Sequence, residues 1–171
     1  GFEMPVWYTS VVDEHKAVRE TAGLFDVTHM GVFQVEGPDA AAFLDSVSSN
    51  DTIFLEIGES VYAHFLDPYG KVIDDLIIYR RDEDRYLLVV NASNEEKDWA
   101  WLNAVKNGEV MVDTAQPWVK VPGRKCILRN LKDPAAGEDQ LISIAIQGPN
   151  SRDILLEMAC DHCEDHKIMR L

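Results

Sequence analysis

The sequence predicts an α+β fold in which antiparallel strands outnumber the helices. Between residues 61 and 90, short apolar runs follow one another with only polar turns between them, which is typical of an antiparallel meander. A strand, a Gly-Pro turn and a helix occur in that order twice, around Gly37 and around Gly148. Strands that pair locally, with only a few helices, favour a layered α+β structure over a doubly wound parallel sheet.

The first helix is expected to begin at Ser10. Asp13 follows Ser10 by three residues, a spacing similar to that of a capping box. Apolar residues continue as far as Val18, and Gly23 provides a stop signal. A helix of about 12 residues fits this stretch.

The two strand-turn-helix units carry the same order of signals. In the first unit an extended run over residues 31–36 meets Gly37 and Pro38, and in the second the run SIAIQ meets Gly148 and Pro149. Glycine permits a tight turn, and proline suits the start of a helix. The recurrence indicates two related units within one chain. The apolar residues expected along their helices are Ala41, Phe43, Leu44, Val47, Ile154 and Leu155.

The meander between these units has three expected strands. They cover residues 61–66, 72–79 and 86–90, and polar turns at residues 67–70 and 82–84 join them. Each strand is therefore expected to pair with the next along the chain.

Two different patterns follow the meander. Ser93 and Glu96 are spaced as a capping box, and Gly108 is a stop signal, so a helix is expected between them. Residues 117–140 instead carry several prolines and glycines around a short apolar stretch at residues 126–131. This composition predicts a loop or hairpin insertion.

Composition restricts the possible functions. The 171 residues suffice for one ordinary domain or two small ones. No apolar run of about 18 residues could span a membrane, and a formal net charge of −14 argues against binding to nucleic acid. Three cysteines and no secretory signal favour a reducing compartment, so the cytoplasm is the expected location.

Two adjacent acids, Asp74 and Asp75, lie inside the apolar run VIDDLIIY. Because side chains alternate along a strand, the two acids are expected on opposite faces, each among hydrophobic residues. An ionised carboxylate in such surroundings needs a ligand, a partner charge or access to solvent. The acids are therefore candidate site residues. The structural alternative is that they pair with Lys71, Arg80 or Arg81 near the ends of the strand.

Other side chains with possible chemistry have weaker patterns. Cys160, His162, Cys163 and His166 have residue types that bind zinc if all four converge, but no second cluster at a matching spacing accompanies them, so no metal site is assigned. His29 could act as a base, although a hydrogen-bonded core or turn histidine is the commoner role. The sequence contains no P-loop, GxGxxG or GxSxG motif.

Six segments of the chain also resemble a known family. They are MPVWYTSVVDEHKAVRETAGLFDVTHMG, VEGPDAAAFL, SNDT, GKVIDDLIIYR, YLLVVNASNEEKDWAWL and IQGPNS. In order and spacing they resemble the amino-terminal half of the glycine-cleavage T-protein, or aminomethyltransferase, family. The resemblance implies a tetrahydrofolate-binding fold with a ferredoxin-like antiparallel layer at residues 31–113. It also implies that residues 1–171 form the amino-terminal part of such a protein, without its carboxy-terminal domain.

The same resemblance implies a function. In this family an aminomethyl group passes from the dihydrolipoyl arm of a carrier, the H-protein, to tetrahydrofolate, and ammonia is released. The first acid of the family's IDDL motif falls on Asp74, which is therefore expected to be the folate-side catalytic acid, with Asp75 as the structural member of the pair. Such a carboxylate can orient the ligand, accept a proton and stabilise a developing positive charge. The folate-binding residues that the resemblance implies are Met30, Tyr62, Val90 and Asn91.

Three departures from the family pattern limit these expectations. Lys71 stands where the family commonly has glycine, the segment at residues 117–140 is longer than expected, and the family's downstream folate-binding glutamate and arginine are absent. Little or no turnover is therefore expected from this piece alone. Two alternatives stay open: a folate-dependent demethylase for another methyl donor, and a non-catalytic folate-binding module.

Overall fold

The structure is a computed structural model that describes residues 3–117 and 125–160. Its described residues form two compact units, one from residues 3–29 and 142–160 and the other from residues 30–141. Within these described residues, no helix has the length and apolar character needed to cross a membrane.

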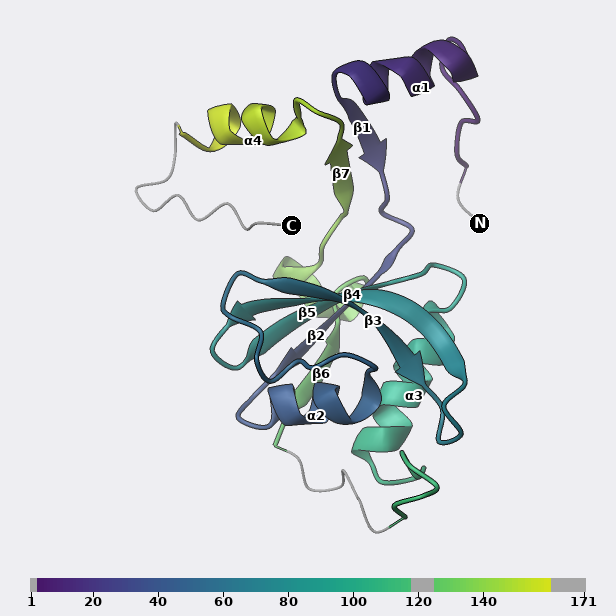
Figure 1. Ribbon diagram of the computed structural model, residues 1–171, viewed down its shortest axis with the longest axis vertical. Coiled ribbons are helices and arrows are strands. Elements are labelled where there is room, and N and C mark those ends of the chain that lie inside the picture. Colours follow the sequence, from purple (N-terminus) through teal and green to yellow (C-terminus); the bar gives the residue numbers. More distant parts are fainter. Residues whose placement is uncertain (1–2, 118–124, 161–171) are drawn as a thin grey trace. The chain divides into compact units, whose positions relative to one another are not determined.

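The first unit is a two-stranded antiparallel sheet with a helix before one strand and after the other (Figure 1). Its elements are α1 (Val11–Glu20), β1 (Gly23–Asp26), β7 (Ile144–Gln147) and α4 (Ser151–Cys160). Strand β1 has four residues, three of them exposed, so it lacks an alternating pattern.

Helix α1 begins at the predicted N-cap. The hydroxyl of Ser10 accepts a hydrogen bond from the backbone N–H of Asp13 at 3.4 Å. The second side chain of the capping box is that of Glu14, whose carboxylate accepts the backbone N–H groups of Thr9, Tyr8 and Ser10. These bonds, that from Thr9 above all, hold the pKa of Glu14 below its ordinary value. The acid that completes the capping box is therefore Glu14, one residue after the predicted Asp13.

The second unit is a five-stranded antiparallel sheet in the order β3-β4-β5-β2-β6 (Figure 1). Helices α2 and α3 lie against one face of it. The predicted α+β class and the β3-β4-β5 meander are confirmed. The elements are β2 (Gly31–Glu36), α2 (Ala40–Val47), β3 (Ser60–Leu66), β4 (Val72–Asp82), β5 (Arg85–Val90), α3 (Glu95–Lys106), β6 (Ile127–Asn130) and the short 3₁₀ helix η1 (Pro134–Asp139).

The ferredoxin-like layer extends further along the chain than residues 31–113. Its β-α-β-β-α-β order is given by β2, α2, β4, β5, α3 and β6, with β3 as an additional edge strand. Strand β6 pairs with β2, Phe33 lying opposite Asn130. Residues 127–130 are thus part of the sheet rather than of a hairpin insertion at residues 117–140. A four-residue strand beside prolines and glycines shows no local pattern that reveals its distant partner.

The hydrophobic core lies between this sheet and the two helices. Alternate strand residues point into it, as period-2 patterning requires. Burial of each large apolar side chain contributes about 1.5–3 kcal/mol relative to exposure. The largest apolar members include Phe33, Phe43, Leu44, Phe65, Leu76, Ile78, Leu88 and Leu102.

The two strand-turn-helix units share their turn conformation, which supports the predicted relationship between them. Gly37 and Gly148 both have φ of +120°. The N–H of Ala40 donates to the carbonyl of Gly37 at 2.9 Å, and that of Ser151 donates to the carbonyl of Gly148 at 3.1 Å. In both units a glycine is required by the same backbone geometry.

Helix α3 begins differently from the prediction. Its N-cap is Asn94, and neither Ser93 nor Glu96 forms the expected capping box. The side chain of Asn94 makes no capping bond: its Oδ1 accepts the ammonium group of Lys97 at 2.9 Å, and its amide donates to Asp74 on β4. The predicted stop is confirmed, since Gly108 has φ of +70° directly after the C-cap.

Candidate functional site

Strand β4 points its two acids to opposite faces of the sheet, as strand alternation predicts. Asp74 lies on the core face, beneath α3, and is 4% exposed. Asp75 is half-buried on the other face, which α2 and α3 do not cover. The two neighbours therefore have different surroundings.

Asp74 is held by hydrogen bonds from the start of α3 and the end of β5. Its Oδ2 accepts the backbone N–H of Asn91 at 3.2 Å, and its Oδ1 accepts the side-chain amides of Asn91 at 3.0 Å and Asn94 at 2.5 Å. Burial by itself would raise the pKa of Asp74, but hydrogen bonds from Asn91, Asp98 and Asn94 outweigh burial and lower it. Asp74 is therefore a buried, ionised carboxylate near a helix N-terminus, where negative charge is favoured.

Asp98 on α3 is a second acid on the core face of the sheet, and it is fully buried. If both carboxyls were ionised, neither oxygen of Asp98 would have a hydrogen-bond donor among the described residues. Burial, the hydrogen bond to Asp74 and repulsion from that carboxylate raise the pKa of Asp98 to about 8, while Lys97 acts in the opposite direction. These surroundings favour the protonated form of the Asp98 carboxyl.

Asp75 is bound by two of the residues predicted for the folate site. The hydroxyl of Tyr62 donates to its Oδ2 at 2.5 Å, and the amide of Asn91 donates to its Oδ1 at 3.1 Å. The hydrogen bond to Asp75 is the main reason why the pKa of Tyr62 is raised. Tyr62 is 56% exposed, so this contact lies at the surface of the unit. Asn91 touches both acids and links the two faces.

Strand register gathers further residues at this end of the sheet. His64 lies directly opposite Asp75, and its ring meets that of Tyr62 edge-on at 5.5 Å. Val90 is the last paired residue of β5 on both sides, so Asp75, Asn91 and Met30 stand one residue beyond it on adjacent strands. Sequence reasoning missed His64; the register of the β3-β4 hairpin would have identified it. The side chain of Val90 points instead into the core.

Almost the whole chain matches one protein-family model. The family model described as the GCVT N-terminal domain matches residues 1–170. The chain belongs to the GCVT N-terminal domain family. This membership agrees with the family resemblance of the sequence motifs.

Individual members of the family are similar over most of this chain. An aminomethyltransferase of Symbiobacterium thermophilum is 44% identical over 161 residues, which cover 93% of this chain and 38% of the relative. One of Exiguobacterium sibiricum is 43% identical, over 99% of this chain and 41% of its own length. The crystal structure of glycine cleavage system aminomethyltransferase T from Bartonella henselae has a TM-score of 0.71 and 33% identity, over 90% of this chain and 37% of that one. The chain therefore spans about two fifths of the length of the relatives it matches.

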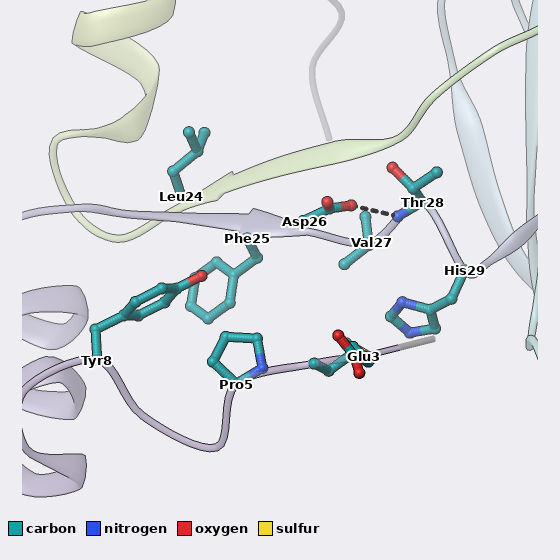
Figure 2. Close-up of a pocket in the computed structure, with 10 residues that line it drawn as sticks. Glu3, Pro5, Tyr8, Leu24, Phe25, Asp26, Val27, Thr28 and His29 are labelled. Carbon is teal, nitrogen blue, oxygen red and sulfur yellow. Dashed lines mark hydrogen bonds between the residues drawn. The ribbon is translucent and has the colours of Figure 1, made fainter. Parts of the chain in front are cut away.

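The first unit of this family member contains a separate cavity of about 480 Å³ (Figure 2). It lies between the N-terminal segment and β1, and its walls are mainly apolar. Asp26 in its lining accepts the N–H of Thr28 at 2.9 Å, and His29, the candidate base, lies at the same end. The apolar lining residues are Met4, Pro5, Leu24, Phe25 and Val27.

The candidate zinc cluster lies at the end of the sequence. His162, Cys163 and His166 are outside the described residues, as is the side chain of Cys160.

Proposed function

We propose that the protein containing this chain is a tetrahydrofolate-dependent aminomethyltransferase of the glycine cleavage system. One structural observation supports the proposal most directly: Tyr62 and Asn91, which the family resemblance places in the folate pocket, both bind Asp75. Family membership over nearly the whole chain and relatives named as aminomethyltransferases also support it.

The folate-side role is proposed for Asp75 rather than for Asp74. Asp74 is 4% exposed, and its oxygens already accept bonds from Asn91 and Asn94. Asp75 is more exposed and lies on the face that carries Tyr62. A group that binds a ligand has to reach it, whereas a fully engaged buried acid can only orient its neighbours.

The residues on this face suit a reduced folate. Beside the polar end with Asp75 and His64, the next register row carries Ile77 and Val89 alongside Tyr62. An apolar surface that ends in a few polar groups is typical of sites for flat heterocycles. When bound, tetrahydrofolate supplies the amine nitrogens that accept the one-carbon unit.

The chain's own contribution is electrostatic and positional. The carboxylate of Asp75 can accept a hydrogen bond from a ligand N–H, stabilise a developing positive charge and take up a proton. Tyr62 and Asn91 hold that carboxylate in one orientation. The apolar neighbours Ile77 and Val89 favour exclusion of water, which strengthens these interactions.

The proposed partner follows from the same assignment, and the proposed location from the cysteine content. A lipoyl carrier, the H-protein, would deliver the aminomethyl group. We also place the protein in the cytoplasm, because the three cysteines of the sequence favour a reducing compartment.

The test uses the full-length protein. Calorimetry should detect tetrahydrofolate binding, and Asp75→Asn should lower the rate of aminomethyl transfer by about 30-fold or more, or about 2 kcal/mol. The matched control is Asp82→Asn, an exposed acid at the other end of β4 that should stay within about threefold of wild type. Absence of folate binding would refute the function. A less than threefold effect of Asp75→Asn would refute the role of that acid, and transfer from a different methyl donor alone would favour a demethylase.

A further inference from the structure

We propose that Asp74 and Asp98 share a single proton in the folded protein, and that this carboxyl pair positions Asn91 against Asp75. The first part concerns the chain by itself. The second part rests on the proposed function, because Asp75 is there the acid that faces the folate. Asp98 is then a positioning residue of the site, although it lies on the opposite side of the sheet.

The geometry of the pair requires a proton. Asp98 is 0% exposed and Asp74 is 4% exposed, so solvent does not compensate their charges. Asp74 accepts three hydrogen bonds from Asn91 and Asn94, whereas both oxygens of Asp98 have no donor among the described residues. Two ionised carboxylates in contact without water repel strongly. One proton between them replaces that repulsion with a hydrogen bond.

The surroundings decide which acid holds the proton. The charged groups that act on Asp98 are Asp74 from β4 and Lys97 from α3. Lys97 is exposed, and its ammonium group donates hydrogen bonds to the carbonyl of Ile73 and to the side-chain oxygen of Asn94. It therefore does not neutralise Asp98 directly. Asp74 receives donors from three groups and Asp98 from none of the described residues, so the proton belongs on Asp98.

A continuous series of hydrogen bonds connects this pair to the opposite face. In the proposed pair the protonated carboxyl of Asp98 donates to Asp74; Asp74 accepts the amide of Asn91 at 3.0 Å, and the same amide reaches Oδ1 of Asp75 at 3.1 Å. Ionisation of Asp98 would remove one donor from Asp74 and place a second negative charge beside it. Asp74 would then compete more strongly for the Asn91 amide, at the expense of Asp75.

The direct test follows the proton by carbon-13 NMR of labelled aspartate carboxyls in the full-length protein. Wild type should show one aspartate that titrates near pH 8, and this transition should be absent in Asp98→Asn. The matched control is Glu96→Gln, an exposed acid in the same turn of α3, which should keep the transition. If no wild-type aspartate is protonated above about pH 6, or if the transition survives in Asp98→Asn, the shared proton is refuted.

A second measurement needs no substrate. Between pH 5 and 7 the unfolding equilibrium constant of wild type should rise by up to about tenfold per pH unit relative to that of Asp98→Asn, because the unfolded acid ionises first. Asparagine retains an N–H donor for Asp74 without titrating, so this variant should fold. Equal pH profiles of the two proteins would contradict the proposal.

The positioning role has its own readout. Wild type should lose transfer activity above pH 8, where Asp98 ionises. Asp98→Asn should keep transfer within about threefold of wild type at pH 7 and should not show this alkaline decline. Asp98→Ala should lose at least about tenfold in transfer rate. If Asp98→Asn is as defective as Asp98→Ala, or keeps the alkaline decline, the positioning role is refuted. If wild type shows the titration but binds no folate, the proposed function fails while the shared proton stands.

Discussion

Tyr62 and Asp75 are joined across β3 and β4 by a phenol-to-carboxylate hydrogen bond of 2.5 Å. They do not face each other in register, since Tyr62 lies opposite Ile77 and the bond runs diagonally along one face of the sheet. Tyr62 is 56% exposed, so the bond orders a surface carboxylate rather than completing a core. We therefore expect this pair to affect ligand binding more than folding.

The first prediction concerns this hydroxyl. Tyr62→Phe should weaken tetrahydrofolate binding by the full-length protein about fivefold, equivalent to about 1 kcal/mol, because Asp75 loses a donor that orients it. The free energy of unfolding should change by less than about 0.5 kcal/mol, as for most surface substitutions. Calorimetry and urea titration measure the two quantities. Unchanged affinity would show that the bond does not belong to the binding site.

The limits of sequence reasoning are visible in the same two acids. Alternation along β4 was sufficient to place Asp74 and Asp75 on opposite faces. Alternation alone does not show which face of the sheet α3 covers, because that depends on the tertiary packing of the helix. For the same reason Asn94 was not predicted to bind Asp74, and the capping box was placed one residue away from the actual N-cap. Strand β6 was missed because its partner β2 is distant in the sequence.

The turn at Gly37, whose backbone conformation recurs at Gly148, gives a second prediction. At Gly37 an added Cβ would lie 2.4 Å from the carbonyl oxygen of Lys125, on a backbone with φ of +120°. Gly37→Ala should therefore destabilise the protein by about 3 kcal/mol, from both backbone strain and the clash. Gly70→Ala is the control, because Gly70 has φ of +77° but nothing within 4 Å of the added Cβ. It should cost about 1 kcal/mol. Equal losses in urea unfolding would contradict the steric part of this account.

A third prediction concerns the packing of α3 on the sheet. An added Cβ at Gly31 would lie 2.6 Å from Cγ2 of Val90 and 2.8 Å from Cγ of Glu95 in the first turn of α3. Gly31→Ala should cost about 2 kcal/mol of stability through overpacking. It should also displace the start of α3, where Asn94 and Asp98 contact Asp74. Chemical shifts of the Asn91 and Asn94 side-chain amides should therefore change; unchanged shifts would show that the helix start tolerates the methyl group.

The fourth prediction contrasts the two acids in stability. Asp74→Asn should lower the free energy of unfolding by about 3 kcal/mol, because buried donors from Asn91 and Asn94 lose their charged acceptor. Asp75→Asn should cost less than about 1 kcal/mol, since solvent can satisfy a half-buried site. Urea unfolding at pH 7 compares them. A larger loss for Asp75→Asn would reverse the assignment of buried and ligand-facing acid.

The pH dependence of that loss provides a check on its cause. The pKa of Asp74 is lowered in the folded state from an ordinary value of 3.8, so ionised Asp74 favours folding. This contribution is fully present above pH 3.8 and is lost as the pH falls through the folded-state pKa. In an Asp98→Asn background, where the coupled acid no longer titrates, the difference in unfolding free energy caused by Asp74→Asn should therefore be constant near neutral pH and become smaller in acid. A difference that does not shrink below the ordinary pKa would mean that packing, rather than the charge of Asp74, accounts for the loss.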